Sequence, residues 1–303
     1  MLVVGLPASP YDHGVTDPGA REELAAFLRA RRTQLDRTAV GLPEVARRRT
    51  AGLRREEVAA LSGVSVTWYT WLEQARDVHP SRQVLDALAT TLHLSPSEHH
   101  YLLSVAGFAP GRAADSPSEN GAPAHIQHLL DALAGSPAFA IGSDWTISGW
   151  NDAYAALYPA VATLPTPERN LLWVVFTDPF VRDLLPDWET TSHRFLAEFR
   201  AEAGARLSQP DCRRLIARLR AHSPEFREAW QRHDIEGFAS RLRTFRTVAG
   251  ELEFEHHRLA AADQRDLFVV IYTPTGRDTV QRLAHLGKPG PAASGDASAA
   301  GSP

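Results

Sequence analysis

The chain has 303 residues, is 44% hydrophobic and carries a formal net charge of −4 at pH 7, so it is long enough for two domains and too acidic to bind nucleic acid over its whole surface. It contains no run of about 18 apolar residues, which excludes a membrane-spanning helix and a membrane partner. Its one cysteine, Cys212, excludes an internal disulfide and a cysteine-based zinc site, and these features indicate a cytoplasmic protein.

Residues 1–20 are predicted to form a disordered leader, because MLVVGLPASPYDHG lacks the basic start and the full apolar core of a signal peptide. A helix is expected over residues 21–35, where apolar residues recur at helical spacing. Its inward residues are Leu24, Phe27, Leu28 and Leu35.

Leu53–Gln74, LRREEVAALSGVSVTWYTWLEQ, predicts two short helices joined by a tight turn. Gly63 lies where the first helix must stop, and glycine tolerates the left-handed conformation that such a stop needs. Ser65 is a candidate N-cap of the second helix. This layout is typical of a DNA-binding helix-turn-helix. The alternative is an ordinary helical hairpin within a globular core.

Two further helices are expected. Ser81–Leu92 has a serine cap and one apolar face. Ser95–Ala106 opens with Ser-Pro-Ser-Glu, which is a capping-box pattern with proline at the first helical position. Residues 21–108 are therefore predicted to form a mainly α-helical DNA-binding domain.

The arginines near this motif predict contact with DNA phosphates. Residues 30–60 contain eight arginines against four acidic residues, a net charge of +4. A local basic patch beside a candidate reading helix is the electrostatic footprint of DNA binding. The alternative is a solvated arginine-rich face. The candidate contacts from this patch are Arg47, Arg48, Arg54 and Arg55.

The second helix of the motif is expected to reach base edges in the major groove through its first exposed residues. Thr67 and Thr70 can hydrogen-bond to bases and touch a thymine methyl, whereas Val66 can only do the latter. Trp68 is placed at the groove margin, and Tyr69 and Trp71 are expected to pack the helix. Ser65 completes the DNA-binding set as the cap.

Residues 21–107 resemble the N-terminal domain of the XRE (phage repressor and Cro-like) family. Within it, GLRREEVAALSGVSVTWYTWLEQ resembles the MmyB-like regulators. This resemblance implies an added loop between the first two helices, here Asp36–Gly52, and a C-terminal ligand-binding domain. It also implies that Arg55 stands where relatives often have a glutamine, so that a phosphate or guanine contact is expected there.

A Pro-, Gly- and Ser-rich linker is predicted over residues 109–123, and a disordered tail over residues 288–303. The second domain, residues 124–287, begins with elements of both kinds. A helix is expected over 126–133, a hairpin of strands over 139–142 and 146–150, and a short helix over 152–157.

The rest of the second domain changes from helical to strand periodicity. An apolar segment, 170–176, is followed by a helix start with Thr177 or Asp178 as cap. Further helices are expected over 186–202, 211–222, 224–232 and 280–286, and strands over 250–259 and 267–273. Strands at both ends with helices between them predict an α+β domain, an antiparallel sheet with helices gathered on one face.

This order resembles a PAS-like sensor fold. The phrases NLLWVVFTDP, LLPDWE, SPEFREAW, RHDI and AGELEFE resemble the ligand-binding domain of the MmyB-like regulators. One departure is the segment Arg243–Leu252, which lacks the His-Pro pair that usually precedes Gly-Glu-Leu in that family. No ligand role of that histidine carries over to this chain.

No catalytic motif or cofactor-binding loop is present, so neither an enzyme nor a cofactor is expected. The adjacent pairs His99-His100 and His256-His257 do not chelate a metal by themselves, because neighbouring side chains point apart. No metal site is therefore predicted. Arg213 and Arg214 could lower the pKa of Cys212, but a plain, partly buried thiol is favoured.

The second domain is rich in aromatic residues, which favours a mostly apolar pocket over the alternative of an ordinary core. Its polar anchors are expected among Asn151, Arg200 and Arg246. The resemblance implies a small apolar, fatty-acid-like ligand. The candidate ligand-binding residues are Trp150, Asn151, Tyr154, Trp173, Phe176, Phe180, Leu196, Phe199, Arg200, Trp230, Phe245 and Arg246.

These features predict a homodimeric transcription regulator that binds a pseudo-palindromic operator in double-stranded DNA. The second domain would sense the small molecule and dimerise, and the ligand would favour one arrangement of the reading helices. The alternative is a constitutive DNA-binding protein whose second domain serves only dimerisation or protein interaction.

Overall fold

A computed structural model describes residues 17–43, 52–108, 121–264 and 266–286. The candidate phosphate contacts Arg47 and Arg48 lie outside the described residues. So do most of the predicted leader, most of the linker and all of the predicted tail.

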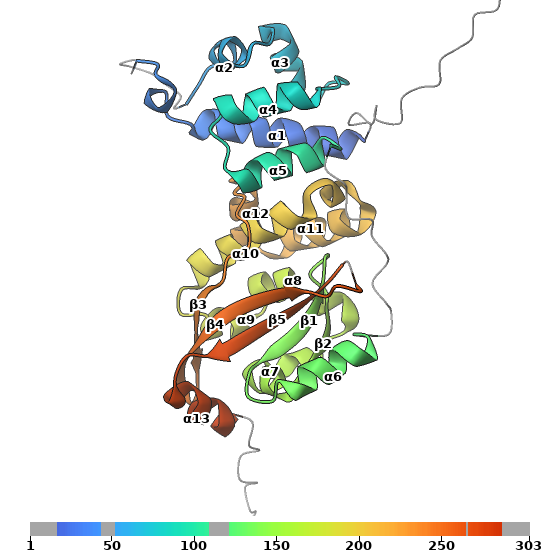
Figure 1. Cartoon of the computed structure of the whole chain (residues 1–303), viewed down its shortest axis with the longest axis vertical. Helices are drawn as coiled ribbons and strands as arrows, with labels where there is room; N and C mark the ends of the chain where they lie inside the picture. The colour runs from blue at the N-terminus through green and yellow to red at the C-terminus, as the bar shows by residue number, and fades with distance from the viewer. Residues whose placement is uncertain (1–16, 44–51, 109–120, 265, 287–303) are drawn as a thin grey trace, which may run out of the picture.

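The N-terminal part is a bundle of α-helices (Figure 1). Its elements are α1 (Pro18–Gln34), the short 3₁₀ helix η1 (Thr38–Val40), α2 (Arg55–Ser62), α3 (Val66–Glu73), α4 (Arg82–Thr91) and α5 (Pro96–Val105). Their buried side chains form a continuous core around Phe27, Leu28, Tyr69, Leu85 and Tyr101.

The predicted helix boundaries follow from caps that the structure contains. Ser65 accepts a hydrogen bond from the amide of Trp68 at 3.1 Å, and Ser95 forms the expected capping box with Glu98. Gly63 ends α2 with a φ of 71°, a conformation that costs glycine little. The predicted helix-turn-helix geometry is confirmed at α2 and α3.

The C-terminal part combines a sheet with eight of the described α-helices and three 3₁₀ helices that precede or follow its strands. The strands are β1 (Ala138–Gly142), β2 (Ile147–Trp150), β3 (Arg241–Thr247), β4 (Gly250–Ala260) and β5 (Leu267–Pro274). The helices are α6 (Ala124–Ala132), α7 (Asp152–Leu157), η2 (Pro159–Ala162), η3 (Thr166–Glu168), α8 (Leu171–Thr177), α9 (Pro179–Leu184), α10 (Trp188–Ala203), η4 (Gly204–Ser208), α11 (Pro210–His222), α12 (Pro224–Gln231) and α13 (Arg277–Leu286).

The sheet is antiparallel, with the strand order β2-β1-β5-β4-β3. The first and last parts of the domain therefore meet at its centre, where β1 pairs with β5. The fold class predicted from the sequence, a mainly α helix-turn-helix region followed by an α+β PAS-like region, is confirmed.

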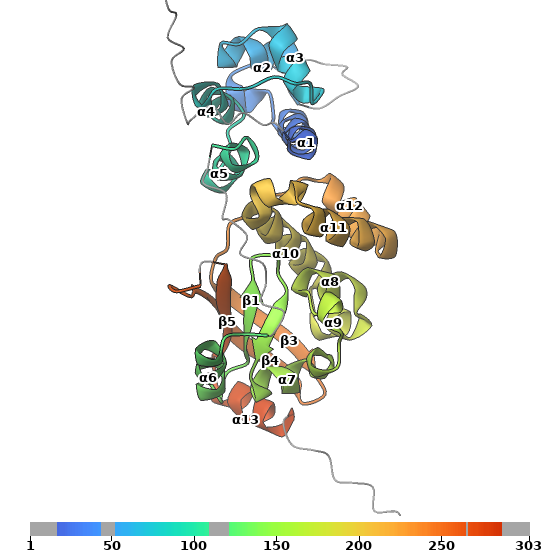
Figure 2. The ribbon, with the colours of Figure 1, turned by 90° about the vertical axis from the view of Figure 1, so that its right-hand side faces the viewer.

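The two faces of the sheet are covered differently (Figure 2). Phe139, Ile141 and Tyr272 point into the main core beneath α7 to α10. Ala138, Ala140 and Val269 point the other way and pack with α6 through Ile126 and Leu130. The expectation that all helices gather on one face is wrong, because the alternate residues of β1 and β5 are apolar as well.

Strand β3 is absent from the elements predicted by sequence. Its outward residue Leu242 is 60% exposed, whereas its inward residue Arg243 is 5% exposed. The apolar residue faces outward and the charged residue faces inward, which is the reverse of the usual pattern. A sequence pattern that looks for alternate buried apolar residues therefore does not detect this strand.

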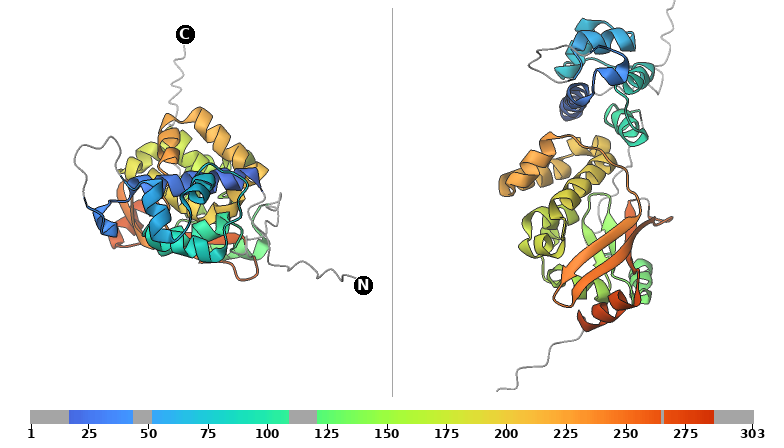
Figure 3. Two further views of the ribbon diagram at one scale, coloured as in Figure 1. Left: turned by 90° about the horizontal axis from the view of Figure 1, so that it is seen from above. Right: turned by 90° about the vertical axis from the view of Figure 1, so that its left-hand side faces the viewer.

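The N-terminal helices rest on the helical layer of the C-terminal part rather than on the sheet (Figure 3). α1 and α5 both contact η4, and α5 also contacts α10. The guanidinium of Arg31 pairs with Glu98 at 2.9 Å and also donates to the carbonyl of His233. The two parts therefore share one continuous buried core.

Gly204 lies at the closest approach of the two parts. Its φ is 44°, and a Cβ added there would lie 2.5 Å from Oγ of Ser104 in α5. The amide of the next residue, Ala205, donates to that hydroxyl at 3.3 Å. The positive φ and the closeness of the Ser104 side chain both favour glycine at this position.

In the described part of the chain, every helix is too short or too polar to cross a membrane.

Candidate DNA-binding surface and apolar cavity

Helix α3 presents an exposed face at its start. Val66 is 40% exposed, Thr67 is exposed and Thr70 is half-buried. Tyr69 and Leu72 point into the core on the opposite side. α3 therefore offers the predicted base-contacting residues on the surface, with Ser65 exposed at its cap.

The two tryptophans of α3 differ from expectation, since Trp71, expected to pack the helix, is the more exposed and Trp68, expected at the groove margin, packs against the core. Trp71 is 41% exposed, and Trp68 is half-buried and packs against the core. Trp71 lies four residues after Thr67 and so shares its outward face, whereas Trp68 lies four residues before the buried Leu72. The expected burial of Tyr69 is confirmed at 0% exposed.

A buried carboxylate that the sequence reasoning missed joins three helices. Glu73, the last residue of α3, is 0% exposed, and its oxygens accept from Nε of Arg32 in α1 at 2.5 Å and from Nε of Arg55 in α2 at 2.7 Å. Burial alone would raise the pKa of Glu73, but the hydrogen bonds from Arg32 and Arg55 outweigh it and lower that pKa. The signal in the sequence is an acidic residue four positions after a buried tyrosine.

The arginines of the basic segment divide into two groups. Arg32 and Arg55 are committed to Glu73, and Arg37 pairs with Glu57. The side chain of Arg55 is still 40% exposed. Arg54 is fully on the surface at the start of α2. The ion pair with Glu73 thus gives Arg55 a structural role in addition to the DNA contact expected of it.

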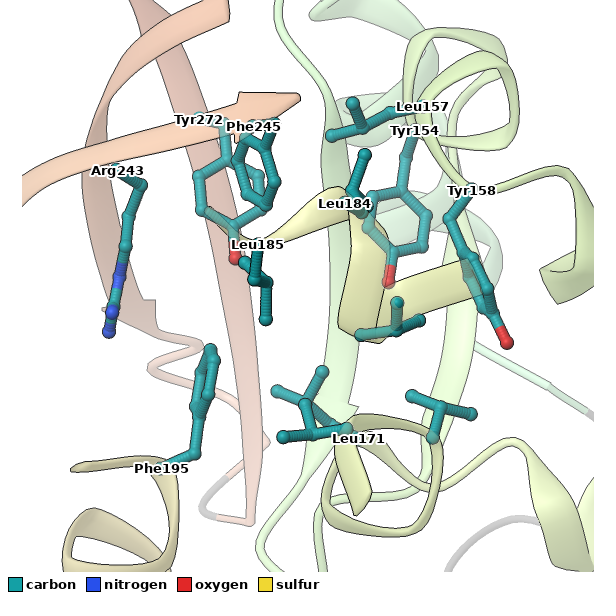
Figure 4. Close-up of a pocket in the computed structure, with 13 residues that line it drawn as sticks. Tyr154, Leu157, Tyr158, Leu171, Leu184, Leu185, Phe195, Arg243, Phe245 and Tyr272 are labelled. Carbon is teal, nitrogen blue, oxygen red and sulfur yellow. The ribbon is translucent and has the colours of Figure 1, made fainter. Parts of the chain in front are cut away.

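An apolar cavity of about 40 Å³ lies between the sheet and helices α7 to α10 (Figure 4). Arg243 and Phe195 stand at one end, and Tyr154 and Tyr158 at the other. The cavity is lined by Tyr154, Leu157, Tyr158, Leu171, Val174, Val175, Val181, Leu184, Leu185, Phe195, Arg243, Phe245 and Tyr272. Two of the predicted ligand-binding residues, Tyr154 and Phe245, are among them.

The polar end of the cavity is a cluster of buried ionisable groups. Arg243 lies 4.0 Å from Glu198 of α10, and neither Nε nor Nη2 of Arg243 has a hydrogen-bond partner. Burial raises the pKa of Glu198 to about 7, although the charge of Arg243 acts to lower it. Burial and the charge of Arg243 lower the pKa of the neighbouring His256 to about 3, so that this imidazole is neutral at pH 7.

The three predicted polar anchors lie away from this cavity. The Asn151 amide caps α7 and donates to the carbonyls of Leu130, Leu133 and Ser136, which closes the turn before β1. Arg246 is exposed because it alternates with Phe245 along β3.

Arg200, the third predicted anchor, points toward the N-terminal helices. It is 1% exposed, lies 3.9 Å from the ring of Trp230 and donates to that residue's carbonyl. Burial acts to raise the pKa of Glu23 in α1, but the nearby His233 and the charge of Arg200 outweigh it and lower that pKa. Arg200 thus belongs to the contact between the two parts.

The other predicted pocket residues also lie outside the lining. Arg218 lies over the ring of Trp173, and His222 meets that ring edge-on. Phe176 packs edge-on against Trp188 and Phe226. Phe180 is 48% exposed, and Trp150 is half-buried. Leu196, Phe199 and Trp230 complete the packing of α10 and α12.

Among the described residues, no three His, Cys, Asp or Glu side chains are grouped closely enough to hold a metal ion. His99 instead contacts Asp86 at 2.7 Å, and His256 stacks on Tyr272. Burial raises the pKa of Cys212 to about 12 despite the nearby charge of Arg206, so the predicted plain thiol fits its surroundings.

Two family models match this chain. Residues 122–286 match the MmyB-like transcription regulator ligand binding domain, and residues 23–102 match a helix-turn-helix domain. The first match alone covers more than half of the chain. No curated protein matches the chain.

Proposed function

The chain belongs to the MmyB-like transcription regulators, which join a helix-turn-helix to a ligand-binding domain. On that premise we propose that an apolar molecule with one anionic end controls how this protein binds its operator. The domains are those of a transcription regulator rather than of an enzyme family. Such a protein acts where the chromosome is, which places it in the cytoplasm.

The DNA contact is proposed for the exposed face of α3. Val66, Thr67, Thr70 and Trp71 share this face, and Arg54 is exposed at the start of α2. A single such helix offers few base contacts, so that useful affinity requires two half-sites spaced by about 34 Å or a multiple of it. A homodimer on a pseudo-palindromic operator supplies them.

The ligand is proposed to place its anionic end at Arg243 and its apolar body among the leucines and valines of the cavity. Arg243 is 5% exposed and two of its nitrogens lack partners, which supports a role in receiving a carboxylate. Because the pKa of Glu198 is about 7, this group can take up a proton as the ligand carboxylate arrives. The negative charge of the ligand then replaces that of Glu198, so the net charge around Arg243 does not change.

A fatty-acid-like ligand requires the cavity to enlarge, because about 40 Å³ holds only a few water-sized spheres. α9 has only six residues and contributes Val181 and Leu184 to the lining. Outward movement of α9 from β3 and α8 is the proposed route. This movement would couple occupancy to the rest of the domain.

The match to the ligand-binding domain, together with the two buried nitrogens of Arg243 that lack a hydrogen-bond partner, carries this proposal. The test is native mass spectrometry of the full chain as purified, followed by titration with saturated fatty acids and gel shifts on its promoter. Arg243→Gln should weaken fatty-acid binding about tenfold or more, since a charge-assisted contact is lost. Arg246→Gln, an exposed arginine of the same strand, is the matched control and should bind as the wild type does.

The small size of the cavity favours a second candidate function, in which the C-terminal part only dimerises or binds a protein partner. In that case no fatty acid would bind at micromolar concentration, and operator affinity would not change on its addition. Equal binding by Arg243→Gln and the wild type would reject the proposed anionic anchor.

A further inference from the structure

A second cavity, of about 420 Å³, lies at the other end of α10. Its walls come from the turn between β1 and β2, from the end of α10 with η4, and from the first half of α11. None of the residues that line the apolar cavity lines this one. Its volume is within the range of small-molecule sites.

Two arginines of this cavity have no acidic partner in the described part of the chain. Arg206 donates to the hydroxyl of Ser143, and its Nε is buried without a hydrogen-bond partner. Arg218 stacks over the ring of Trp173 at 4.3 Å, and its contact with the carbonyl of Pro167 is 3.4 Å long. Both guanidiniums therefore remain available to an anion.

The acidic residues of the lining are already engaged. Asp144 accepts from the amide of Thr146 at 3.1 Å and from its hydroxyl at 2.7 Å, and Asp211 pairs with Arg214. α11 begins here without a side-chain cap, so its first-turn amides and its positive dipole end add to the field of the arginines.

Phe199, Ala203 and Leu215 form an apolar part of the wall, and Asn170 and Gln209 add two amides to the lining. We propose that this cavity binds a small organic anion, a carboxylate or a phosphate on an apolar body, through Arg206 and Arg218. The site is additional to the proposed apolar ligand site and does not depend on it. Because η4 forms one wall and also contacts α1 and α5, occupancy would be sensed by the N-terminal part.

The test uses the full-length chain and three probes that share a phenyl ring, phenyl phosphate, benzoate and benzamide, in calorimetric titrations. Benzamide is the neutral counterpart of benzoate. We expect phenyl phosphate or benzoate to bind and the neutral benzamide to bind at least tenfold more weakly. The stronger of the two anions identifies the acidic group of the natural ligand.

Two variants locate the binding. Arg206→Gln and Arg218→Gln should each weaken the preferred anion about tenfold, because each removes one charge-assisted contact. Arg213→Gln removes the same charge from an exposed position of the same helix, outside the lining, and should leave the affinity unchanged. Circular dichroism checks that the variants fold.

Cys212 reports on occupancy because it lines the cavity and is the single cysteine of the chain. The bound anion should slow its alkylation by iodoacetamide severalfold, and benzamide at the same concentration should not. The proposal is overturned if no anion binds at millimolar concentration, if benzamide protects equally, or if Arg206→Gln and Arg213→Gln lose affinity equally.

Discussion

At the scale of single residues, burial shifts the pKa values of two neighbours of Arg243 in opposite directions. Glu198 is 2% exposed and its pKa is raised to about 7, chiefly by burial. His256 is 4% exposed and its pKa is lowered to about 3, also chiefly by burial. Between pH 4.5 and about 7 the carboxyl of Glu198 therefore keeps a proton that it would lose in water. Between about pH 3 and pH 6.5 the imidazole of His256 stays neutral, although it would be protonated in water.

Glu198→Gln should change how stability depends on pH. The folded pKa of Glu198 is above its unfolded value of 4.5, so the wild type loses stability as pH rises from 4.5 to about 7. The size of the pKa shift of Glu198 corresponds to a loss of roughly 3 kcal/mol in the free energy of unfolding. The glutamine variant should not show this loss, because its side chain does not titrate. Urea unfolding at pH 5 and pH 8 measures it. Glu189→Gln, at an exposed position of the same helix, should follow the wild type, and identical pH profiles for all three proteins would contradict the prediction.

Trp71 and Thr67 are expected to contribute to operator recognition as a pair on one face of α3. Thr67→Ala and Trp71→Ala should each cost about 1–3 kcal/mol of specific binding, measured by gel shift on the promoter against random DNA. Thr90→Ala, an exposed threonine on α4, is the control and should bind normally. A loss shared equally by specific and random DNA would assign these residues to general affinity instead.

At the scale of elements, the three helices of the DNA-binding motif are joined by Glu73. Its carboxylate reaches α1 through Arg32 and α2 through Arg55, so the geometry of the reading helix depends on one buried charge. A buried pair that loses one partner leaves the other charge uncompensated, which is costly.

Glu73→Gln should lower the free energy of unfolding by roughly 3 kcal/mol at pH 7. The lowered pKa of Glu73 gives the wild type stability that is present above about pH 4.5 and is lost as pH falls through the folded value. The variant should lack this acid-dependent loss. Unfolding curves from pH 3 to pH 7 would show it. Glu56→Gln, exposed on α2, should retain the wild-type profile, and equal stability of both variants at pH 7 would exclude the role given to Glu73.

The elements that sequence predicted best are those with local signals. Ser65, Ser95 and Gly63 mark helix ends through contacts within four residues, and each was placed correctly. Strand β3 was missed because its inward Arg243 is matched by partners on α10 and β4 that no local pattern reveals. For the same reason the anchors Asn151, Arg200 and Arg246 were chosen for their chemistry, while their positions depend on packing between distant segments.

At the scale of the whole molecule, the two parts are joined by a contact that includes charged groups. Glu23 of α1 accepts from the hydroxyl of Tyr101 at 2.5 Å and lies 3.6 Å from Nδ1 of His233. Gln34 donates to the carbonyl of Arg232. α1 contacts both α3 and η4, so this contact links one wall of the second cavity to the reading helix.

A homodimer is expected in solution, because one α3 cannot supply the affinity that an operator requires. Sedimentation velocity between 1 and 50 μM (on the order of intracellular concentrations) should give a mass of twice 33.3 kDa. A single protomer at every concentration, with and without operator, would contradict the expectation.

Single-nucleotide substitutions at Gly204 are expected to disrupt the contact between the two parts. Every amino acid one nucleotide away from a glycine codon has a side chain, and each would begin with the Cβ that meets Ser104 at 2.5 Å. Such alleles would disturb the contact between η4 and α5, and so separate reading from sensing, while leaving the apolar cavity and α3 intact. Under selection for unregulated expression of the target genes, we expect escape mutants to accumulate at codon 204 more often than at the glycines, such as Gly41 and Gly276, where an added Cβ meets nothing. Sequencing of such mutants would reveal the hot spot.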